Sequence, residues 1–263
     1  MKDLILFGGQ SNMQGQTERL AESSPVPGAM EYRYLTDSLI PLRDPCGEDI
    51  RADGTEGYPY SSAAASTWHS DNVLGSSCDG HTTLLPEFCR AYIRHAPEHP
   101  EVTAVHGAKG STDMKYWLPG TDGYRILTAK AKAARAKSGG IRYTAMVWLQ
   151  GESDAIYGVS SDDYAAMLSG FGHALEKDLG LTRFGIIRVG RFTRDERDLA
   201  VMEAQDRLCR EDSLFVMLTR AASDFCTMPE YCEYMNPHVG GHYSAAGLQK
   251  LGSLAGETLA RQI

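Results

Sequence analysis

The chain has 263 residues, of which 42% are hydrophobic and 23% are charged, a composition typical of one large globular domain with a sizeable core. Its formal net charge of −8 argues against nucleic acid as a partner. No apolar run approaches the roughly 20 residues that a membrane-spanning helix needs, so a membrane is not an expected partner either.

The chain opens on a short apolar run at 4–7, followed by Gly8, Gly9 and the sequence Gln-Ser-Asn-Met. A continuous apolar run is typical of a strand buried on both faces of a parallel sheet. The two glycines allow a sharp turn that places Ser11 just beyond the carboxyl end of this strand, where open α/β sheets bind ligands. Ser11 is therefore a candidate nucleophile; alternatively, it caps a helix, a position that serine also favours.

The next region, 17–82, is rich in proline, glycine, serine and aspartate. We expect it to be one long irregular loop inserted into the domain. Loops of this length are uncommon in compact domains, where they usually form lids or binding loops.

Helices and strands alternate in the rest of the chain. The clearest helix begins at Asp162 and ends before Gly180, because apolar side chains recur between them at 3.6-residue spacing. Ser244 is expected to cap the last helix. Further helices are predicted at 84–95, 122–137 and 198–210, and strands at 102–106, 142–149, 184–189 and 214–218. The alternation predicts an α/β fold, with helices on both faces of a parallel sheet, in a single domain spanning 1–263.

The cysteines give no sign of disulfides or of a metal site. There are six, without a Cys-x-x-Cys pair: Cys46, Cys78, Cys89, Cys209, Cys226 and Cys232. The first apolar run follows residues 1–3 directly and leads into the Gly-Gly-Gln-Ser turn rather than into a cleavage site. We therefore expect reduced thiols, a cytoplasmic location and neither a metal nor another cofactor.

Three polar segments are candidates to join Ser11 at the edge of the sheet. Segments 107–112 and 150–154 each follow a predicted strand, and 236–244 precedes the last helix. Each has an ordinary structural explanation when taken alone: a glycine turn, a capping or solvated carboxylate pair, and a structural histidine. Together they would bring N–H donors and a histidine to a serine, a combination that favours acyl transfer.

The motif sequences resemble those of a known family. Gly-Gln-Ser-Asn-Met at 9–13, Ala-Lys-Gly-Ser-Thr at 108–112 with Trp117 behind it, and Trp-Leu-Gln-Gly-Glu-Ser-Asp at 148–154 resemble successive blocks of the SGNH hydrolases. More narrowly, they resemble the branch that contains sialate O-acetylesterases and the acetylxylan esterases of carbohydrate esterase family six. The resemblance implies a three-layer α/β/α flavodoxin-like fold with a central parallel sheet. It also implies metal-independent removal of O-acetyl groups from a sugar of the sialic acid or xylan type.

The resemblance also implies roles for individual residues. Ser11 matches the nucleophile, and His242, in His-Tyr-Ser-Ala-Ala-Gly, matches the general base. The oxyanion would be held by the N–H groups of Ser11 and Gly110 and by a side-chain amide. In the wider superfamily this amide is an asparagine at the position of Ser153. Gln150 is the better candidate here, because a hydroxyl is a shorter and less directed donor.

One departure from the family concerns the acid of the triad. The family usually has an aspartate three residues before the histidine, where this chain has Val239, and allowing one inserted residue brings only His238 to that place. Three explanations are open. Glu152 orients His242, a backbone carbonyl orients it and leaves a Ser–His dyad, or the site is degenerate. Where an enzyme depends on this acid, its loss costs about 10⁴ in rate.

Substrate contacts and rival functions stay open at this stage. Three aromatic residues in 17–82 are candidates to stack on a sugar or to pack locally: Tyr58, Tyr60 and Trp68. Four basic residues either bind a sialic acid carboxylate or are solvated: Lys109, Lys115, Arg188 and Arg191.

Rival functions are a carbohydrate-binding pseudoenzyme, another hydrolase such as a thioesterase or lysophospholipase, and a phosphate or flavin binder. The first turn lacks the glycine-rich phosphate cradle that the last would need.

Overall fold

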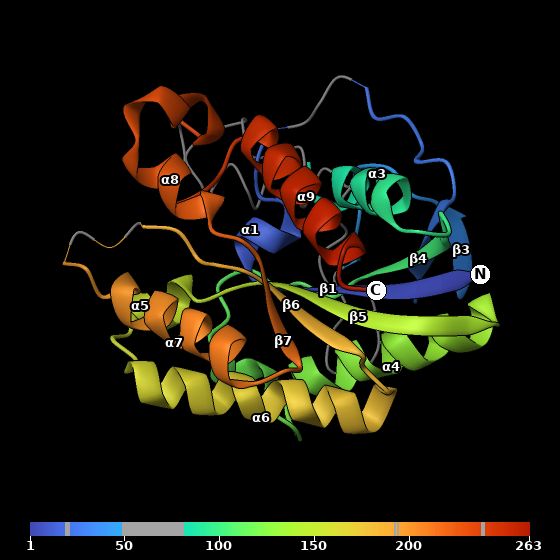
Figure 1. Ribbon diagram of the computed structural model, residues 1–263, viewed down its shortest axis with the longest axis horizontal. Helices are drawn as coiled ribbons and strands as arrows, with labels where there is room; N and C mark the ends of the chain where they lie inside the picture. The colour runs from blue at the N-terminus through green and yellow to red at the C-terminus, as the bar shows by residue number, and fades with distance from the viewer. Residues whose placement is uncertain (19–21, 49–81, 192, 194, 238–239) are drawn as a thin grey trace.

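A sheet of seven strands runs between two layers of helices in the part of the chain that this computed structural model describes (Figure 1). The described residues are 1–18, 22–48, 82–191, 193, 195–237 and 240–263. The strands are β1 Lys2–Gly9, β2 Ala29–Arg33, β3 Ser38–Pro41, β4 Glu101–His106, β5 Ile141–Leu149, β6 Arg183–Ile187 and β7 Phe215–Thr219. Their order across the sheet is β3-β2-β4-β1-β5-β6-β7. The predicted three-layer α/β/α fold is confirmed.

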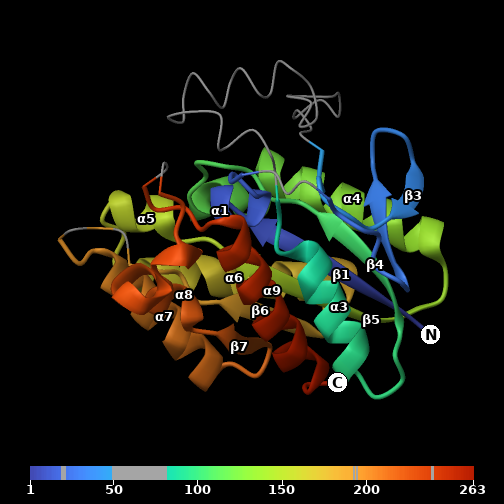
Figure 2. The same cartoon turned by 90° about the horizontal axis from the view of Figure 1, so that it is seen from above.

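Helices cover both faces of this sheet. They are α1 Ser11–Gln14, α3 Leu85–His95, α4 Asp122–Ser138, α5 Glu152–Ile156, α6 Ser161–Leu179, α7 Asp198–Glu211, α8 Ala221–Thr227 and α9 Ala245–Ala260, with 3₁₀ turns η2 Met114–Trp117 and η3 Pro229–Tyr234. Helices α3 and α9 lie side by side on one face, and α4, α6 and α7 lie on the other (Figures 1 and 2). None of these helices is long and apolar enough to cross a membrane.

One edge of the sheet corrects the expectation for 17–82. All neighbouring strands are parallel except β2 and β3, which form an antiparallel pair inside this region. These strands have only five and four residues, so their sequences carry little periodic signal, and pairing of β2 with β4 supplies the order. Residues 19–21 and 49–81, and with them Tyr58, Tyr60 and Trp68, lie outside the described residues.

The hydrophobic core has two parts, one on each face of the sheet, and both are formed by buried apolar side chains. On the α6 side, the ring centroids of Trp148 and Phe171 lie 5.1 Å apart. On the other side, α9 approaches α3 so closely that a Cβ at Gly252 or Gly256 would overlap a carbonyl of Leu84 or Phe88. Ser244 caps α9 as expected, since its Oγ accepts from the Gly247 N–H at 3.1 Å.

The position of β1 brings the motif segments together. β1 lies between β4 and β5, with Phe7 opposite His106 and Gly9 opposite Leu149. Because the three strands are parallel, the segments that follow them emerge at the same edge. The chain that leads into α9 passes beside α1 at this edge (Figure 2). Residues close to Ser11 in the chain contact all three segments: Gln14 accepts from the Gly110 N–H, Gln10 from the Ser153 N–H, and Asn12 from the Tyr243 N–H.

The turn after β1 depends on the absence of a side chain at Gly9. Gly9 has a φ of 144°, and a Cβ there would overlap the Leu149 carbonyl of β5. We expect Gly9→Ala to lower the free energy of unfolding by about 3 kcal/mol or more, measured by urea unfolding. Gly170→Ala is the matched control, because a Cβ at this position in α6 meets no atom within 4 Å, and it should be neutral or slightly stabilising. Equal effects of the two substitutions would contradict this explanation.

Candidate active site

Ser11 is the first residue of α1, at the carboxyl end of β1. The residue that flanks the helix is Gln10, and its side chain makes no capping hydrogen bond. The alternative in which Ser11 caps the helix is therefore wrong. The N–H of Gln10 donates to the Leu149 carbonyl at 3.2 Å, which ties the turn to β5. Ser11 itself has no intrahelical acceptor for its N–H, as is general for the first residue of a helix.

His242 lies in the segment between η3 and α9, and a backbone group orients its ring. Its Nδ1 is 3.1 Å from the Gly240 carbonyl. Since a carbonyl only accepts, Nδ1 carries the proton and Nε2 carries the lone pair. Nε2 is shielded from solvent and has no hydrogen-bond partner among the described residues. Burial lowers the pKa of His242 below its ordinary value of 6.5, which favours the neutral ring.

Glu152, at the start of α5, does not make the contact with His242 that one of the three explanations requires. Its Oε1 accepts from Asn12 Nδ2 at 2.7 Å, and its Oε2 has no partner among the described residues. The reason is geometric: Asn12 lies between the carboxylate and the segment that carries His242. Three explanations were open for the missing aspartate before His242. The hydrogen bonds of His242 and Glu152 agree with the one in which a backbone carbonyl orients the imidazole. Val239 and His238 lie outside the described residues.

Asn12 is the residue at this site that the sequence reasoning missed. Besides the bond to Glu152, its Nδ2 donates to the Gly241 carbonyl at 3.1 Å, and its Oδ1 accepts from the Tyr243 N–H at 3.2 Å. The available signal was its place directly after Ser11 in the Gln-Ser-Asn-Met block. The site thus joins the segments after β1 and β5 to the segment before α9 through one carboxamide.

Two of the three expected oxyanion donors are already engaged. The Gly110 N–H donates to Gln14 Oε1 at 2.5 Å. The side chain of Gln150 is fully buried, and its Nε2 lies 2.5 Å from an Asp154 oxygen and 3.1 Å from the Thr112 carbonyl. Gln150 therefore does not present a free amide to the site, which corrects the expectation. The Ser153 N–H is engaged as well, since it donates to Gln10 Oε1 at 3.1 Å.

Gln150 instead connects several elements beneath the site. The Tyr164 hydroxyl of α6 donates to the carbonyl of Gln150, and Gln205 of α7 donates to the same carbonyl at 2.9 Å. Asp154 accepts from the N–H of Met114 in η2, and burial raises the pKa of Asp154 to about 6. These contacts hold the end of β5, and with it Glu152, against the surrounding helices.

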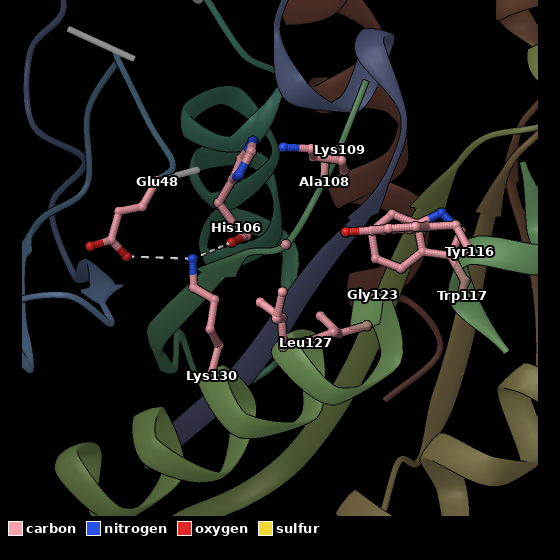
Figure 3. A pocket seen from close by; sticks show the side chains of 11 residues that line it. Glu48, His106, Ala108, Lys109, Tyr116, Trp117, Gly123, Leu127 and Lys130 are labelled. Atoms are coloured by element: carbon pink, nitrogen blue, oxygen red, sulfur yellow. Dashed lines mark hydrogen bonds and ion pairs between the residues drawn. The ribbon is translucent and has the colours of Figure 1, made fainter. Parts of the chain in front are cut away.

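A small pocket lies beside the segment 107–110 (Figure 3). Lys130 of α4 donates to the His106 carbonyl at 2.7 Å and lies 3.4 Å from the Glu48 carboxylate, with both side chains nearly fully buried. This pair anchors the end of β4, from which the Gly110 segment starts. Lys109 also lines the pocket. Among the other basic residues considered for a sugar carboxylate, Arg188 pairs with Asp206 and Arg191 with Asp198, whereas Lys115 is exposed.

Comparison with known proteins shows which family the chain resembles. Residues 1–254 match the family of carbohydrate esterases described as sialic acid-specific acetylesterases. The chain belongs to this family. It is a carbohydrate O-acetylesterase, and its fold is that of the SGNH hydrolases. Among curated proteins, none matches the sequence.

Solved structures of low sequence identity share the fold. A protein from Arabidopsis thaliana is similar at 19% identity and a TM-score of 0.63, with 98% of each chain covered. NanS is similar at 14% identity and a TM-score of 0.61, covering 99% of this chain and 96% of its own. A carbohydrate acetylesterase from Xanthomonas citri is similar at 13% identity and a TM-score of 0.53, and the match covers 99% of this chain and 57% of that protein.

The burial of Glu152 makes the stability of the protein depend on pH. Burial raises the pKa of Glu152 from 4.5 to about 7, so its contribution to stability is present below pH 4.5 and is lost as the pH rises through 7. We expect Glu152→Gln to raise the free energy of unfolding at pH 8 by about 1–3 kcal/mol, and to change it little at pH 4.5. Urea unfolding at the two pH values measures this. Glu98→Gln, at a half-exposed carboxylate, is the control, and an equal effect of Glu152→Gln at both pH values would contradict the explanation.

Proposed function

We propose that this acetylesterase removes O-acetyl groups from sialic acids with Ser11 as nucleophile and His242 as general base. The family description supports the choice of sugar. The observation that carries the proposal is the hydrogen bond between His242 Nδ1 and the Gly240 carbonyl. It selects the ring tautomer whose Nε2 can accept a proton from a serine hydroxyl.

The reaction proceeds in two steps. Ser11 Oγ attacks the acetyl carbonyl while His242 Nε2 takes the hydroxyl proton, and that proton then passes to the departing sugar oxygen. Water, deprotonated by the same Nε2, attacks the acetyl group on Ser11 and releases acetate. Burial favours the neutral form of His242 at neutral pH, the form that accepts a proton. Nε2 has no partner among the described residues, and the proposal requires it to bond Ser11 Oγ when substrate is bound, as catalytic hydrogen bonds commonly tighten at that stage.

The oxyanion is held by backbone N–H groups. The Ser11 N–H has no competing acceptor in its helix. The Gly110 N–H joins it when the Gln14 side chain, whose Oε1 it now binds, moves aside for the acetyl oxygen. Each such donor is typically worth about 3–4 kcal/mol in the transition state. Gln150 takes no part, because its amide is buried and bonded elsewhere.

A cytoplasmic location also stays a prediction. The described cysteines 46, 89, 209, 226 and 232 are free thiols, which fits a reducing compartment.

Removal of either reacting side chain tests the mechanism. Ser11→Ala and His242→Ala should each lower kcat for p-nitrophenyl acetate by at least about 10⁴-fold, because the two groups act as a unit. A fluorophosphonate should label the wild type at Ser11, with the mass of the adduct as readout, and should not label Ser11→Ala. His173→Ala is a control at an exposed histidine that pairs with Glu176 and Asp212. Retained turnover in Ser11→Ala would overturn the proposal.

The sugar is tested by comparison of substrates. The chain should release acetate from O-acetylated sialic acid with a higher kcat/KM than from acetylated xylan, and should prefer acetyl over longer acyl esters. A preference for xylan would leave the mechanism in place and change the substrate.

A further inference from the structure

We infer that Asn12 is a positioning residue for this reaction, and that Glu152 acts on the base through Asn12 rather than by touching it. The inference rests on the function proposed above, because it takes Ser11 as the nucleophile and His242 as the base. It assigns a task to two buried polar side chains that the proposed chemistry does not use.

The carboxamide of Asn12 holds the backbone on both sides of His242. Nδ2 donates to the Gly241 carbonyl at 3.1 Å, and Oδ1 accepts from the Tyr243 N–H at 3.2 Å. The His242 carbonyl is held as well, since it accepts from the Asn236 N–H at 2.9 Å. The ring is thus fixed by its own backbone and by the bond from Nδ1 to Gly240. A histidine held in this way has a defined direction for Nε2.

Glu152 determines which way the carboxamide faces. Its Oε1 takes the second Nδ2 hydrogen at 2.7 Å, so that each polar group of the Asn12 side chain has a partner. Asn12 is 2% exposed and Glu152 is 5% exposed, so water does not substitute for these bonds. A half-turn of the amide would place its oxygen against two acceptors, the Glu152 carboxylate and the Gly241 carbonyl. Because such buried mismatches are costly, one orientation of Asn12 is stable.

Asn12 therefore links the nucleophile to the base through few bonds. It directly follows Ser11 in α1, and it directly contacts the residues that flank His242. In this arrangement Glu152 needs to offer an acceptor oxygen, and a negative charge is not required. A triad carboxylate is different, since it bonds the imidazole directly and fixes its tautomer, and its replacement by an amide costs about 10⁴ in rate.

The first test removes the carboxamide. Asn12→Ala should lower kcat for p-nitrophenyl acetate about 100-fold, the cost of a small misplacement of a catalytic group, while KM changes by less than about three-fold. Circular dichroism and thermal unfolding show that the variant is folded. A kcat within about three-fold of the wild type would overturn the inference.

The second test exchanges donor and acceptor between the two side chains. Asn12→Asp should lower kcat at least as much as Asn12→Ala, because it sets a carboxylate against Glu152 and the Gly241 carbonyl. Addition of Glu152→Gln restores one hydrogen bond, because the new amide at position 152 can donate to the new carboxylate at position 12. The double variant should therefore have a kcat about ten-fold higher than Asn12→Asp alone. Should Asn12→Ala fail to fold, this pair carries the test, and absence of recovery would overturn the inference.

Substitutions of Glu152 alone separate its two possible modes of action. Glu152→Gln keeps the acceptor oxygen and should cost less than about ten-fold in kcat, whereas Glu152→Ala should cost clearly more. Equal losses would show that the charge acts on His242 directly. Glu31→Gln is the matched control for loss of a buried carboxylate, because Glu31 contacts Gly47 and Arg33 instead of Asn12.

The outcomes also separate this inference from the proposed function. If Ser11→Ala is inactive while Asn12→Ala turns over like the wild type, only the positioning role fails. If Ser11→Ala stays active, the nucleophile itself has been assigned wrongly.

Discussion

The carboxamide of Asn12 joins three segments that are far apart in the chain. Its partners lie 140 and 229 residues away, in the segment after β5 and in the segment before α9. The position of the histidine segment relative to Ser11 depends on this junction. β1 delivers Ser11 to the edge of the sheet, and the junction keeps the histidine segment beside it. A fully satisfied amide is suited to the task, because each of its bonds excludes the flipped orientation.

Buried polar groups support the site. Gln150, Glu152 and Asp154 lie in the segment after β5, and burial raises the pKa of both carboxyl groups. The pair of Lys130 and Glu48 anchors the end of β4 (Figure 3). Buried ions contribute little net stability, because desolvation offsets much of their attraction. What they provide here is a fixed position for the segments that carry Glu152 and Gly110.

Much of the fold could be predicted from local signals in the sequence. The helix that begins after Ser160 has acidic residues in its first turn, recurring apolar positions and Gly180 in a left-handed conformation after its end. The central strand β1 contains a continuous apolar run at 4–7, which is fully buried. β2 and β3 were missed because strands of this length depend on their partner for order, and β2 finds it in β4. The meeting of the segments after β1, β4 and β5 follows from parallel strand order, whereas the segment before α9 is held there by Asn12.

The details of the site could not be predicted, because they depend on where side chains point. Nothing in the sequence shows that Gln14 turns toward the Gly110 N–H, or that Gln150 turns inward to Asp154. The explanation in which Glu152 orients His242 placed the carboxylate in the correct region, but its partner is Asn12. The resemblance to a family pointed to the serine and the histidine, whereas the role of Asn12 is visible only from its contacts in the structure.

The central claim is that a dyad of Ser11 and His242 is oriented by backbone and by Asn12, without a carboxylate on the imidazole. A crystal structure of the fluorophosphonate adduct on Ser11 tests it most directly. We expect His242 Nε2 within about 3.2 Å of an oxygen of the adduct. We also expect Nδ1 on the Gly240 carbonyl and Asn12 on the groups that flank the ring. A carboxylate bound to Nδ1, or a ring turned away from the adduct, would contradict the account.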